Sequence, residues 1–237
     1  MSRRTPRVPA LHLHAEGSSR RAAPVLSEEP LEIRLIDGPR YRLPRTPGND
    51  IELAHGLLYA EGLITRAEDL SEARYCAGAE GENQCNTYNV LDLRLNPQVG
   101  PPPEVERTGA SISTTEVRAL LEATPVAQPD DLYQASAMRE GHTTHREDLA
   151  AINAVDKVMG ALLVAEPAAQ RPARGAFLLL SARPTLDVLR RAQRAGFRGV
   201  SSPLTPTGAA VEHAREHGLI LLCCKNTALL YSGDLHE

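Results

Sequence analysis

Residues 175–224 decide the fold: GAFLLLSARPTLDVLRRAQRAGFRGVSSPLTPTGAAVEHAREHGLILLCC. Three short apolar runs in this stretch indicate strands, and the two segments between them have the spacing of amphipathic helices. Gly196 and Gly218 stand where a glycine commonly ends a helix. Continuous apolar strands between such helices are typical of a buried sheet with helices on both faces. We therefore predict an α/β layered core, with strands at about 175–181, 197–201 and 219–224 and helices at about 184–195 and 206–217.

The chain before this core predicts a mixed α+β portion. Apolar and polar residues alternate in three segments, and the turn Asp37-Gly38-Pro39 joins the first two into a hairpin. The strands are expected at 31–35, 40–43 and 91–95. Two helices begin with the sequence of a capping box. One follows Asn49 and ends at Gly62, and the other follows Ser113.

Polar segments lie before and after this α+β portion. Residues 1–24 contain five Arg, two His and three Pro without an apolar period, which predicts a disordered or loosely attached arm. The polar stretch that ends at Arg146 predicts a loop with one helical turn, followed by a long helix at about 147–164. We expect the arm to precede an N-terminal α+β portion, 25–125, and an α/β portion, 126–237, which together form one domain.

Composition excludes several classes of protein. Of 237 residues, 42% are apolar, which supports a buried core, and 26 Lys and Arg against 30 Asp and Glu give a net charge of −4. This balance provides no general attraction to nucleic acid or to an anionic membrane. Aromatic residues make up only 3% and Trp is absent, which argues against a base-stacking surface. No apolar run could cross a bilayer, no secretory signal is recognised and four cysteines make no disulfide framework, so we predict a cytoplasmic protein.

Two carboxylates of the helix expected at 147–164 lie on its apolar face. Asp156 falls inside the arc of apolar residues, and so does Asp148, although in the first turn Asp148 could instead cap the helix. A buried carboxylate requires hydrogen-bond donors or a cation. Asp156 therefore either anchors a structural network or projects into a polar pocket as an acid–base group. Asn153 and Lys157 flank the same face at i and i+4, where they could line that pocket or meet water.

Histidines and cysteines provide further candidates. His142 and His145 have His-x-x-His spacing, but no Glu or Cys beside them completes a zinc pattern, so we predict no metal site and treat them as a candidate proton relay. Cys223 and Cys224 are adjacent, and their side chains should point to opposite faces of a strand. We expect one thiol in the core and the other exposed at the strand end, where α/β sheets place ligands, and we include Cys224 among the catalytic candidates.

Several motifs occur in the order seen in the formate dehydrogenase accessory sulfurtransferases (FdhD). The most specific is Glu147-Asp148 followed by Asn153-Ala154-Val155-Asp156-Lys157, and Asn86-Thr87-Tyr88-Asn89-Val90 supports it. From about residue 25 onward the chain resembles this family. The other motifs are Glu29-Pro30-Leu31, Thr46-Pro47-Gly48, Glu61-Gly62 and Pro206-Thr207.

The resemblance implies a cytidine-deaminase-like α/β fold and a homodimer. It also implies that sulfur passes from a cysteine desulfurase to the molybdenum cofactor of a molybdoenzyme, with the cofactor held through its guanine-nucleotide portion. Molybdopterin guanine dinucleotide is then the expected cofactor. The residues that the resemblance assigns to its binding are Asn153, Lys157, Ser181, Arg183, Thr207 and Lys225.

The chain departs from the family pattern at the nucleophile. Counted back from the helix after Ser113, the two positions of the family's sulfur-bearing cysteines hold Gly109 and Ile112. The family's Gly-Arg-His-Asn is Ala150-Ala151-Ile152-Asn153 here, so its Arg and His are absent. Because only a thiol forms and transfers a persulfide, the usual sulfur chemistry is excluded at the usual position.

Three hypotheses remain. The first, which we favour, is a repurposed, cofactor-independent enzyme that acts on a small molecule through Asp148 or Asp156, with His142 or His145 as a second proton relay. The second is a non-catalytic accessory protein that still binds the guanine-nucleotide cofactor or its target molybdoenzyme. The third keeps sulfur transfer but moves the thiol to Cys223, Cys224 or Cys85.

Overall fold

A six-stranded sheet forms the centre of the α/β portion. The computed structural model describes residues 5–76, 89–97, 110–126 and 131–237. The strand order is β13-β12-β11-β10-β8-β9, in which β10, β11 and β12 are parallel and the other neighbours are antiparallel. The strands are β8 (Tyr133–Arg139), β9 (His142–Asp148), β10 (Phe177–Leu180), β11 (Gly199–Ser202), β12 (Ile220–Cys224) and β13 (Ala228–Ser232).

Helices cover both faces of this sheet. Alternate strand residues enter two separate apolar clusters: Leu178 and Leu180 pack with the helices of one face, and Phe177 and Leu179 pack with Leu120 on the other. The prediction of an α/β fold is therefore confirmed. The first face carries α3 (Ala151–Ala165), α4 (Leu186–Ala195) and α5 (Gly208–His217), and the second carries α2 (Thr114–Ala123).

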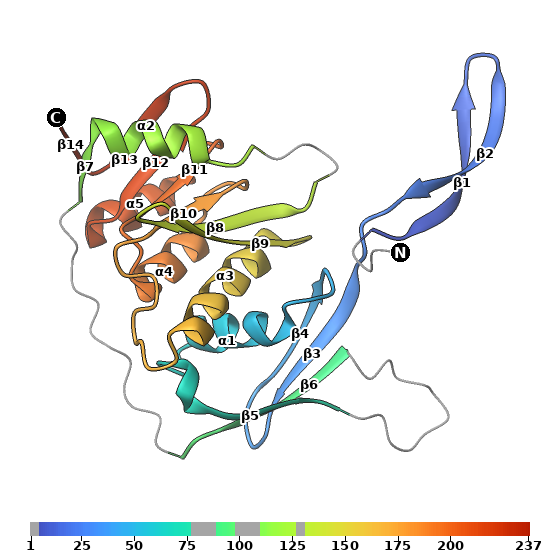
Figure 1. Ribbon diagram of the computed structural model, residues 1–237, viewed down its shortest axis with the longest axis horizontal. Coiled ribbons are helices and arrows are strands. Elements are labelled where there is room, and N and C mark those ends of the chain that lie inside the picture. The colour runs from blue at the N-terminus through green and yellow to red at the C-terminus, as the bar shows by residue number, and fades with distance from the viewer. Residues whose placement is uncertain (1–4, 77–88, 98–109, 127–130) are drawn as a thin grey trace.

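A second, smaller sheet lies beyond the helices, so that α1 and α3 are sandwiched between two sheets (Figure 1). Its strand order is β4-β3-β6-β5. These elements are β3 (Glu29–Leu35), β4 (Arg40–Arg45), α1 (Asp50–Glu61), the short 3-10 helix η1 (Ala67–Asp69), β5 (Leu70–Tyr75) and β6 (Val90–Leu95). The predicted hairpin at 31–43 and the strand at 91–95 are confirmed.

Two glycines allow α1 and α3 to cross in backbone contact. A Cβ atom at Gly56 would lie 1.9 Å from the carbonyl oxygen of Asp156, and a Cβ at Gly160 would lie 1.8 Å from that of Glu52. Any side chain at either position would therefore overlap the opposite backbone. The crossing therefore sets the short distance between α1 and α3.

Several ends of helices agree with the sequence. Gly62, Gly196 and Gly218 adopt left-handed conformations at the ends of α1, α4 and α5. The capping box of Ser113 and Glu116 is present at the start of α2. Asn49 does not cap α1 with its side chain, because its own backbone is left-handed, with φ of 60°.

Residues 133–148 are the main error of the sequence-based prediction. They form the β8–β9 hairpin instead of a loop, and α3 begins at Ala151, so that Asp148 ends a strand and is not part of a helix. The physical reason is the turn, in which Glu140 and Gly141 have φ of 51° and 80°. Two successive left-handed residues match the twist of a two-residue hairpin.

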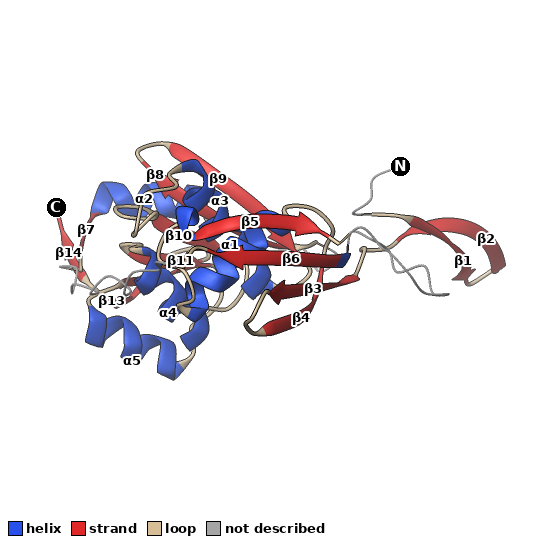
Figure 2. Cartoon of the chain, turned by 90° about the horizontal axis from the view of Figure 1, so that it is seen from below, coloured by secondary structure: helices blue, strands red, loops and turns tan. Residues whose placement is uncertain are grey.

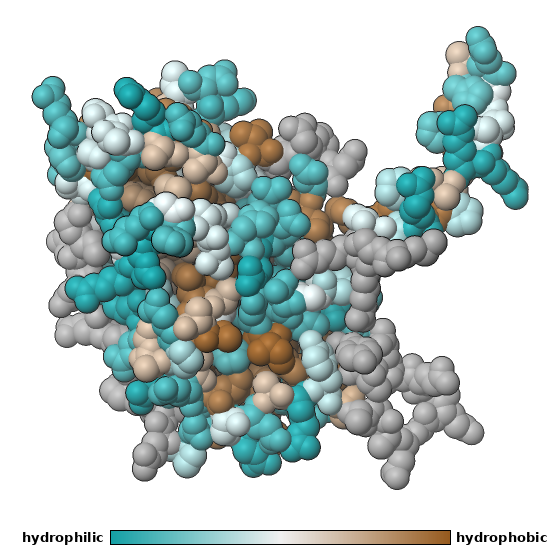
Figure 3. All heavy atoms as spheres, viewed as in Figure 1, coloured by the Kyte–Doolittle hydropathy of each residue, from teal (hydrophilic) through white to brown (hydrophobic). Residues whose placement is uncertain are grey.

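The N-terminal arm is a β-hairpin that projects from the body (Figures 1 and 2). β1 (Arg7–His14) pairs along its whole length with β2 (Gly17–Pro24). The sequence predicts a disordered or loosely attached arm here, and the structure gives these residues a hairpin, because cross-strand hydrogen bonds give the backbone regular structure without a buried face. Leu11 and Leu13 stay 58% and 75% exposed, and the arm carries both hydrophilic and hydrophobic residues (Figure 3).

A two-stranded parallel ladder completes the described structure. β7 (Ser111–Ser113) pairs with β14 (Asp234–His236) next to the start of α2. Within the described ranges, no helix is long and apolar enough to cross a bilayer.

Candidate functional site

Four residues that the sequence assigned to cofactor binding gather where the parallel strands end. Ser181 follows β10, Thr207 precedes α5 in the connection after β11, and Lys225 follows β12. Arg183 lies two residues beyond Ser181. Because β10, β11 and β12 are parallel neighbours, their carboxyl ends share one edge of the sheet, which is where open α/β sheets bind ligands. We refer to Ser181, Arg183, Thr207 and Lys225 as the carboxyl-edge set.

The carboxyl-edge set combines anchored and exposed side chains. Ser181 is buried, and its hydroxyl accepts a hydrogen bond from the Gln134 backbone N–H at 2.9 Å. Thr207 caps α5, with its hydroxyl accepting from the Ala210 N–H at 3.3 Å. Arg183 donates to the carbonyl of Thr205, and both Arg183 and Lys225 are exposed.

The electrostatics of this edge suit an anion. Two exposed cations lie there, and both α4 and α5 begin there, so their N-terminal N–H groups add positive potential. Phosphate groups are the biological anions that such an arrangement commonly holds. The set thus fits the phosphates of a nucleotide-bearing cofactor.

Asp148, Asn153 and Lys157 lie together in a closed internal network. Asp148 and Lys157 are both 0% exposed, and Lys157 Nζ lies 2.7 Å from Asp148 Oδ2. Asn153 Nδ2 donates to Asp148 Oδ1 at 3.1 Å, and the Ala150 N–H donates to the same oxygen at 3.0 Å. Lys157 also donates to the Thr46 carbonyl at 2.9 Å.

This network joins the end of β9, the start of α3 and the loop after β4. A buried ion pair is tolerated only when further hydrogen bonds satisfy its remaining atoms, and that condition is met for Asp148. Thr46, which the sequence assigned only to a family motif, closes the network by donating its N–H to Asp148 Oδ2 at 3.2 Å. With no exposed surface on either charged side chain, the geometry favours a structural role.

Asp156 makes a separate ion pair with α4. Its carboxylate accepts from Arg191 Nε at 2.7 Å, and its side chain is 2% exposed. Burial raises the pKa of Asp156 to about 6; the Arg191 guanidinium opposes this shift, and the charge of Glu61 adds to it. Of the two roles that the sequence left open, the contacts favour the structural anchor.

The structure does not bring His142 and His145 together. Both lie on β9, and residues three positions apart on a strand point to opposite faces. Both are exposed, and His145 Nδ1 lies 3.0 Å from the Ser136 hydroxyl while its Nε2 lies 3.4 Å from Glu147 Oε1. Among the described residues, no group of three or more His, Cys, Asp or Glu side chains could hold a metal ion.

The cysteines at the end of β12 differ from expectation. Both Cys223 and Cys224 are buried, because the strand is covered on both faces up to its last residue, so the exposed thiol predicted there is absent. Burial raises the pKa of the Cys224 thiol, although hydrogen bonds with Ser201 and Thr124 act to lower it. Cys85, the other candidate for a relocated thiol, lies outside the described residues.

Two further positions bear on sulfur chemistry. Ile112, at one of the two positions that the resemblance assigns to sulfur-bearing cysteines, is fully buried against α2, while Gly109 lies outside the described residues. Cys76 is half-buried and lies near the Arg34 guanidinium, which donates to both carboxylate oxygens of Asp92 at 2.6 and 2.8 Å. Sequence reasoning missed Cys76, since its only signal is its position after a strand.

Comparison with known proteins places the chain in a family. The model of the FdhD/NarQ family matches residues 121–234. The protein named sulfur carrier protein FdhD in Corynebacterium efficiens is 36% identical, with 82% of this chain and 83% of that protein aligned. Its namesake in Nocardia farcinica is 34% identical, with 92% and 88% aligned. The chain belongs to the FdhD/NarQ family.

A solved structure supports the fold. A crystal structure from Desulfotalea psychrophila, described as a formate dehydrogenase accessory protein, has a TM-score of 0.73 over 97% of both chains. Its sequence identity of 17% makes this a likeness of fold alone.

Proposed function

We propose that this chain is an accessory protein for a molybdoenzyme of the formate dehydrogenase class and binds the guanine-nucleotide portion of molybdopterin guanine dinucleotide at the carboxyl edge. The observation that carries the proposal is the carboxyl-edge set itself, with two exposed cations beside two helix N-termini. Relatives of 31–36% identity named as FdhD sulfur carriers support it. A cytidine-deaminase-like layering belongs to the same proposal.

This reading replaces the acid–base enzyme as the better supported hypothesis. Asp148 is enclosed with Lys157, and Asp156 is paired with Arg191, so neither carboxylate has a free side chain to offer a substrate. A general acid or base must come within hydrogen-bond distance of the reacting group. The buried positions of both aspartates therefore weigh against that hypothesis.

Binding of GDP tests the proposal, because GDP carries the guanine and phosphate groups expected at the carboxyl edge. We expect isothermal titration calorimetry to show binding that weakens about 10-fold or more in the double variant Arg183→Gln/Lys225→Gln, since each removes a charge-assisted hydrogen bond. Arg118→Gln, on the exposed surface of α2, is the matched charge control and should bind GDP as the wild type does. Absence of GDP binding to the folded wild type would refute the carboxyl-edge proposal.

A second function, sulfur transfer through Cys76, is favoured by the exposure of this thiol. Cys76 is the only partly exposed cysteine within the described part of the chain, and a sulfur-accepting thiol must be accessible to its donor; the nearby Arg34 is itself paired with Asp92. In this step the Cys76 thiolate attacks the outer sulfur of a desulfurase persulfide. One S–S bond forms, the donor's S–S bond breaks, and the donor cysteine leaves as a thiolate.

Mass spectrometry tests this second function. After incubation with a cysteine desulfurase and cysteine, we expect a sulfur adduct that reductant removes and that peptide mapping assigns to Cys76. Cys76→Ser should lose it, whereas Cys224→Ser should keep it. An adduct that persists in Cys76→Ser, or no adduct beside a family member that acquires one, contradicts the role of Cys76.

A further inference from the structure

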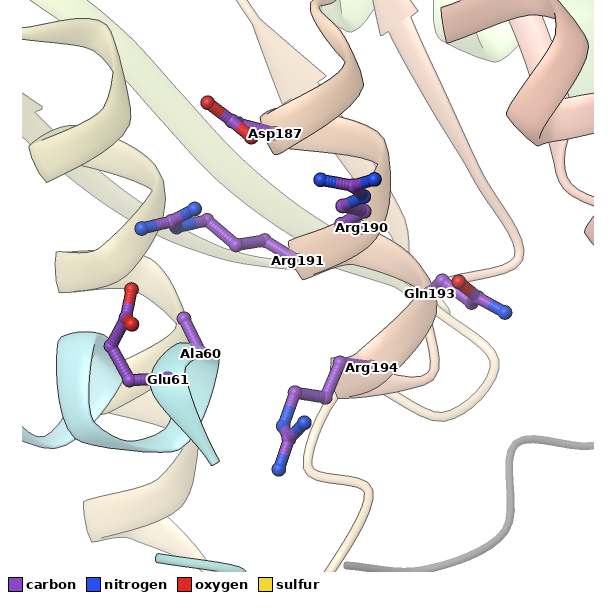
Figure 4. Close-up of a pocket in the computed structure, with 7 residues that line it drawn as sticks. All are labelled: Ala60, Glu61, Asp187, Arg190, Arg191, Gln193 and Arg194. Carbon is purple, nitrogen blue, oxygen red and sulfur yellow. The ribbon is translucent and has the colours of Figure 1, made fainter. Parts of the chain in front are cut away.

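A polar pocket lies between the end of α1 and one side of α4 (Figure 4). Its volume is about 400 Å³, within the usual range of small-molecule sites. None of the carboxyl-edge set lines it, so it is separate from the proposed cofactor site. The lining residues are Ala60, Glu61, Asp187, Arg190, Arg191, Gln193 and Arg194.

Three arginines give this pocket an excess of positive charge over its two carboxylates. Arg190 and Arg194 are four positions apart on α4, so both leave the same side of the helix, and their guanidinium groups point away from each other (Figure 4). Such a pair destabilises a helix by a few tenths of a kcal/mol when nothing neutralises it. No ion pair of the described residues joins Arg190 or Arg194 to a carboxylate.

Arg194 has donors that lack an acceptor. Its Nε and Nη2 atoms are buried and make no hydrogen bond within the described structure. The guanidinium stays near the pocket because it lies over the Tyr59 ring, 5.5 Å from the ring centre, and the Tyr59 hydroxyl lies 2.7 Å from the Arg194 carbonyl. Buried donors without partners are rare in folded proteins, and an anion that draws the Arg194 guanidinium into the pocket would satisfy them.

The other charged residues that line the pocket determine which kind of ligand it favours. Arg191 is held in place by Asp156, so it lines the pocket as a fixed cation and not as a mobile one. Glu61 and Asp187 enter from α1 and α4 and make no ion pair that the described structure records (Figure 4). Carboxylates accept hydrogen bonds from hydroxyl groups and repel a second anion. With Ala60 as its one apolar lining residue, the pocket favours a polar ligand.

We propose that this pocket binds a phosphorylated polyhydroxy compound, such as a sugar phosphate, with its phosphate against Arg190 and Arg194 and its hydroxyls against Glu61 and Asp187. Guanidinium groups match the geometry of phosphate through paired N–H donors. The volume leaves room for the group that carries the phosphate. This site is additional to the proposed accessory function and does not depend on it.

Calorimetry with three probes tests the site: glucose 6-phosphate, glucose and inorganic phosphate. We expect glucose 6-phosphate to bind the wild type and to stabilise it against heat, inorganic phosphate to bind at least about 10-fold more weakly, and glucose not to bind. Arg190→Gln/Arg194→Gln should lower the affinity for glucose 6-phosphate about 10-fold or more. Arg190→Gln alone changes an exposed side chain, so it serves as the folded test variant if Arg194→Gln lowers stability.

Two controls decide the location. Arg118→Gln removes the same charge elsewhere, and Arg183→Gln/Lys225→Gln disables the carboxyl edge; both should bind glucose 6-phosphate as the wild type does. If Arg118→Gln weakens binding as much as Arg190→Gln, the effect is one of net charge and the site is refuted. If only the carboxyl-edge variant loses binding, the ligand lies at that edge, and the pocket proposal fails while the accessory function stands.

Discussion

Because of Asp156, we expect the protein to lose stability as the pH rises. An ordinary ion-paired carboxylate has the opposite effect, since it loses its contribution to stability as the pH falls. The Asp156 carboxylate is buried on α3 and accepts a hydrogen bond from Arg191 at 2.7 Å. Two effects compete, since burial raises its pKa and the guanidinium lowers it, and burial is the larger. We therefore expect the proton to be bound more tightly in the folded protein than in the unfolded chain.

The magnitude follows from the pKa values. A rise from 3.8 to about 6 is about two units, which corresponds to about 3 kcal/mol between the protonated and ionised forms. The folded pKa is the higher one, so this contribution to stability is fully present below about pH 3.8 and is lost as the pH rises through about 6. Between pH 5 and pH 7 the free energy of unfolding should fall by about 1.3 kcal/mol on account of Asp156 alone.

Urea unfolding at pH 5 and pH 7 measures this change. We expect the stability of the wild type relative to Asp156→Asn to decrease by about 1.3 kcal/mol from pH 5 to pH 7, because Asn carries no titrating proton. Glu212→Gln, which alters an exposed carboxylate on α5, is the control and should follow the wild type. If the stability of the wild type relative to Asp156→Asn stays constant or increases toward pH 7, the effect of Arg191 on the pKa of Asp156 outweighs that of burial, and the reasoning is refuted.

Three other substitutions test the packing. Gly160→Ala should lower the free energy of unfolding in urea by at least about 2 kcal/mol, because its Cβ would lie 1.8 Å from a carbonyl oxygen of α1, whereas Gly208→Ala has open space around it and should not. Lys157→Met should cost about 3–5 kcal/mol at pH 7 by leaving the buried Asp148 carboxylate without its cation, and a loss below about 1 kcal/mol would contradict the network. Ser113→Ala should cost about 1 kcal/mol by thermal unfolding, as the loss of an N-cap hydrogen bond does, and Ser113→Thr, which keeps the hydroxyl that also donates to Glu116, should restore most of it.

The sequence predicted the parts of the fold that are encoded locally. The strands β10, β11 and β12 are continuous apolar runs, and glycines mark the ends of α4 and α5, so their positions follow from short windows. The β8–β9 hairpin was missed because its buried face is made of alanines, such as Ala135 and Ala137, which give only a weak alternation. The arm was missed for a similar reason, since its strands bury no face.

The candidate site was predictable only in part. The position of Asp156 on an apolar face correctly indicated burial, but its partner Arg191 lies 35 residues further along the chain and could not be chosen from spacing. The same holds for Thr46, which reaches Asp148 across 102 positions. The end of β12 was predicted as a place for ligands, but the exposed thiol expected there is absent, because coverage of both faces by other elements cannot be derived from the strand itself.

The glycine crossing of α1 and α3 also limits how the chain can be divided. The two helices come from opposite halves of the sequence. At its glycine, each helix has backbone without a side chain, and the backbone of the other helix packs directly against it. A fragment that stops before α3 would expose that backbone to water together with the apolar side chains around it. Each half should therefore aggregate when produced alone, and co-expression of the two halves should recover a complex in which both become resistant to proteases.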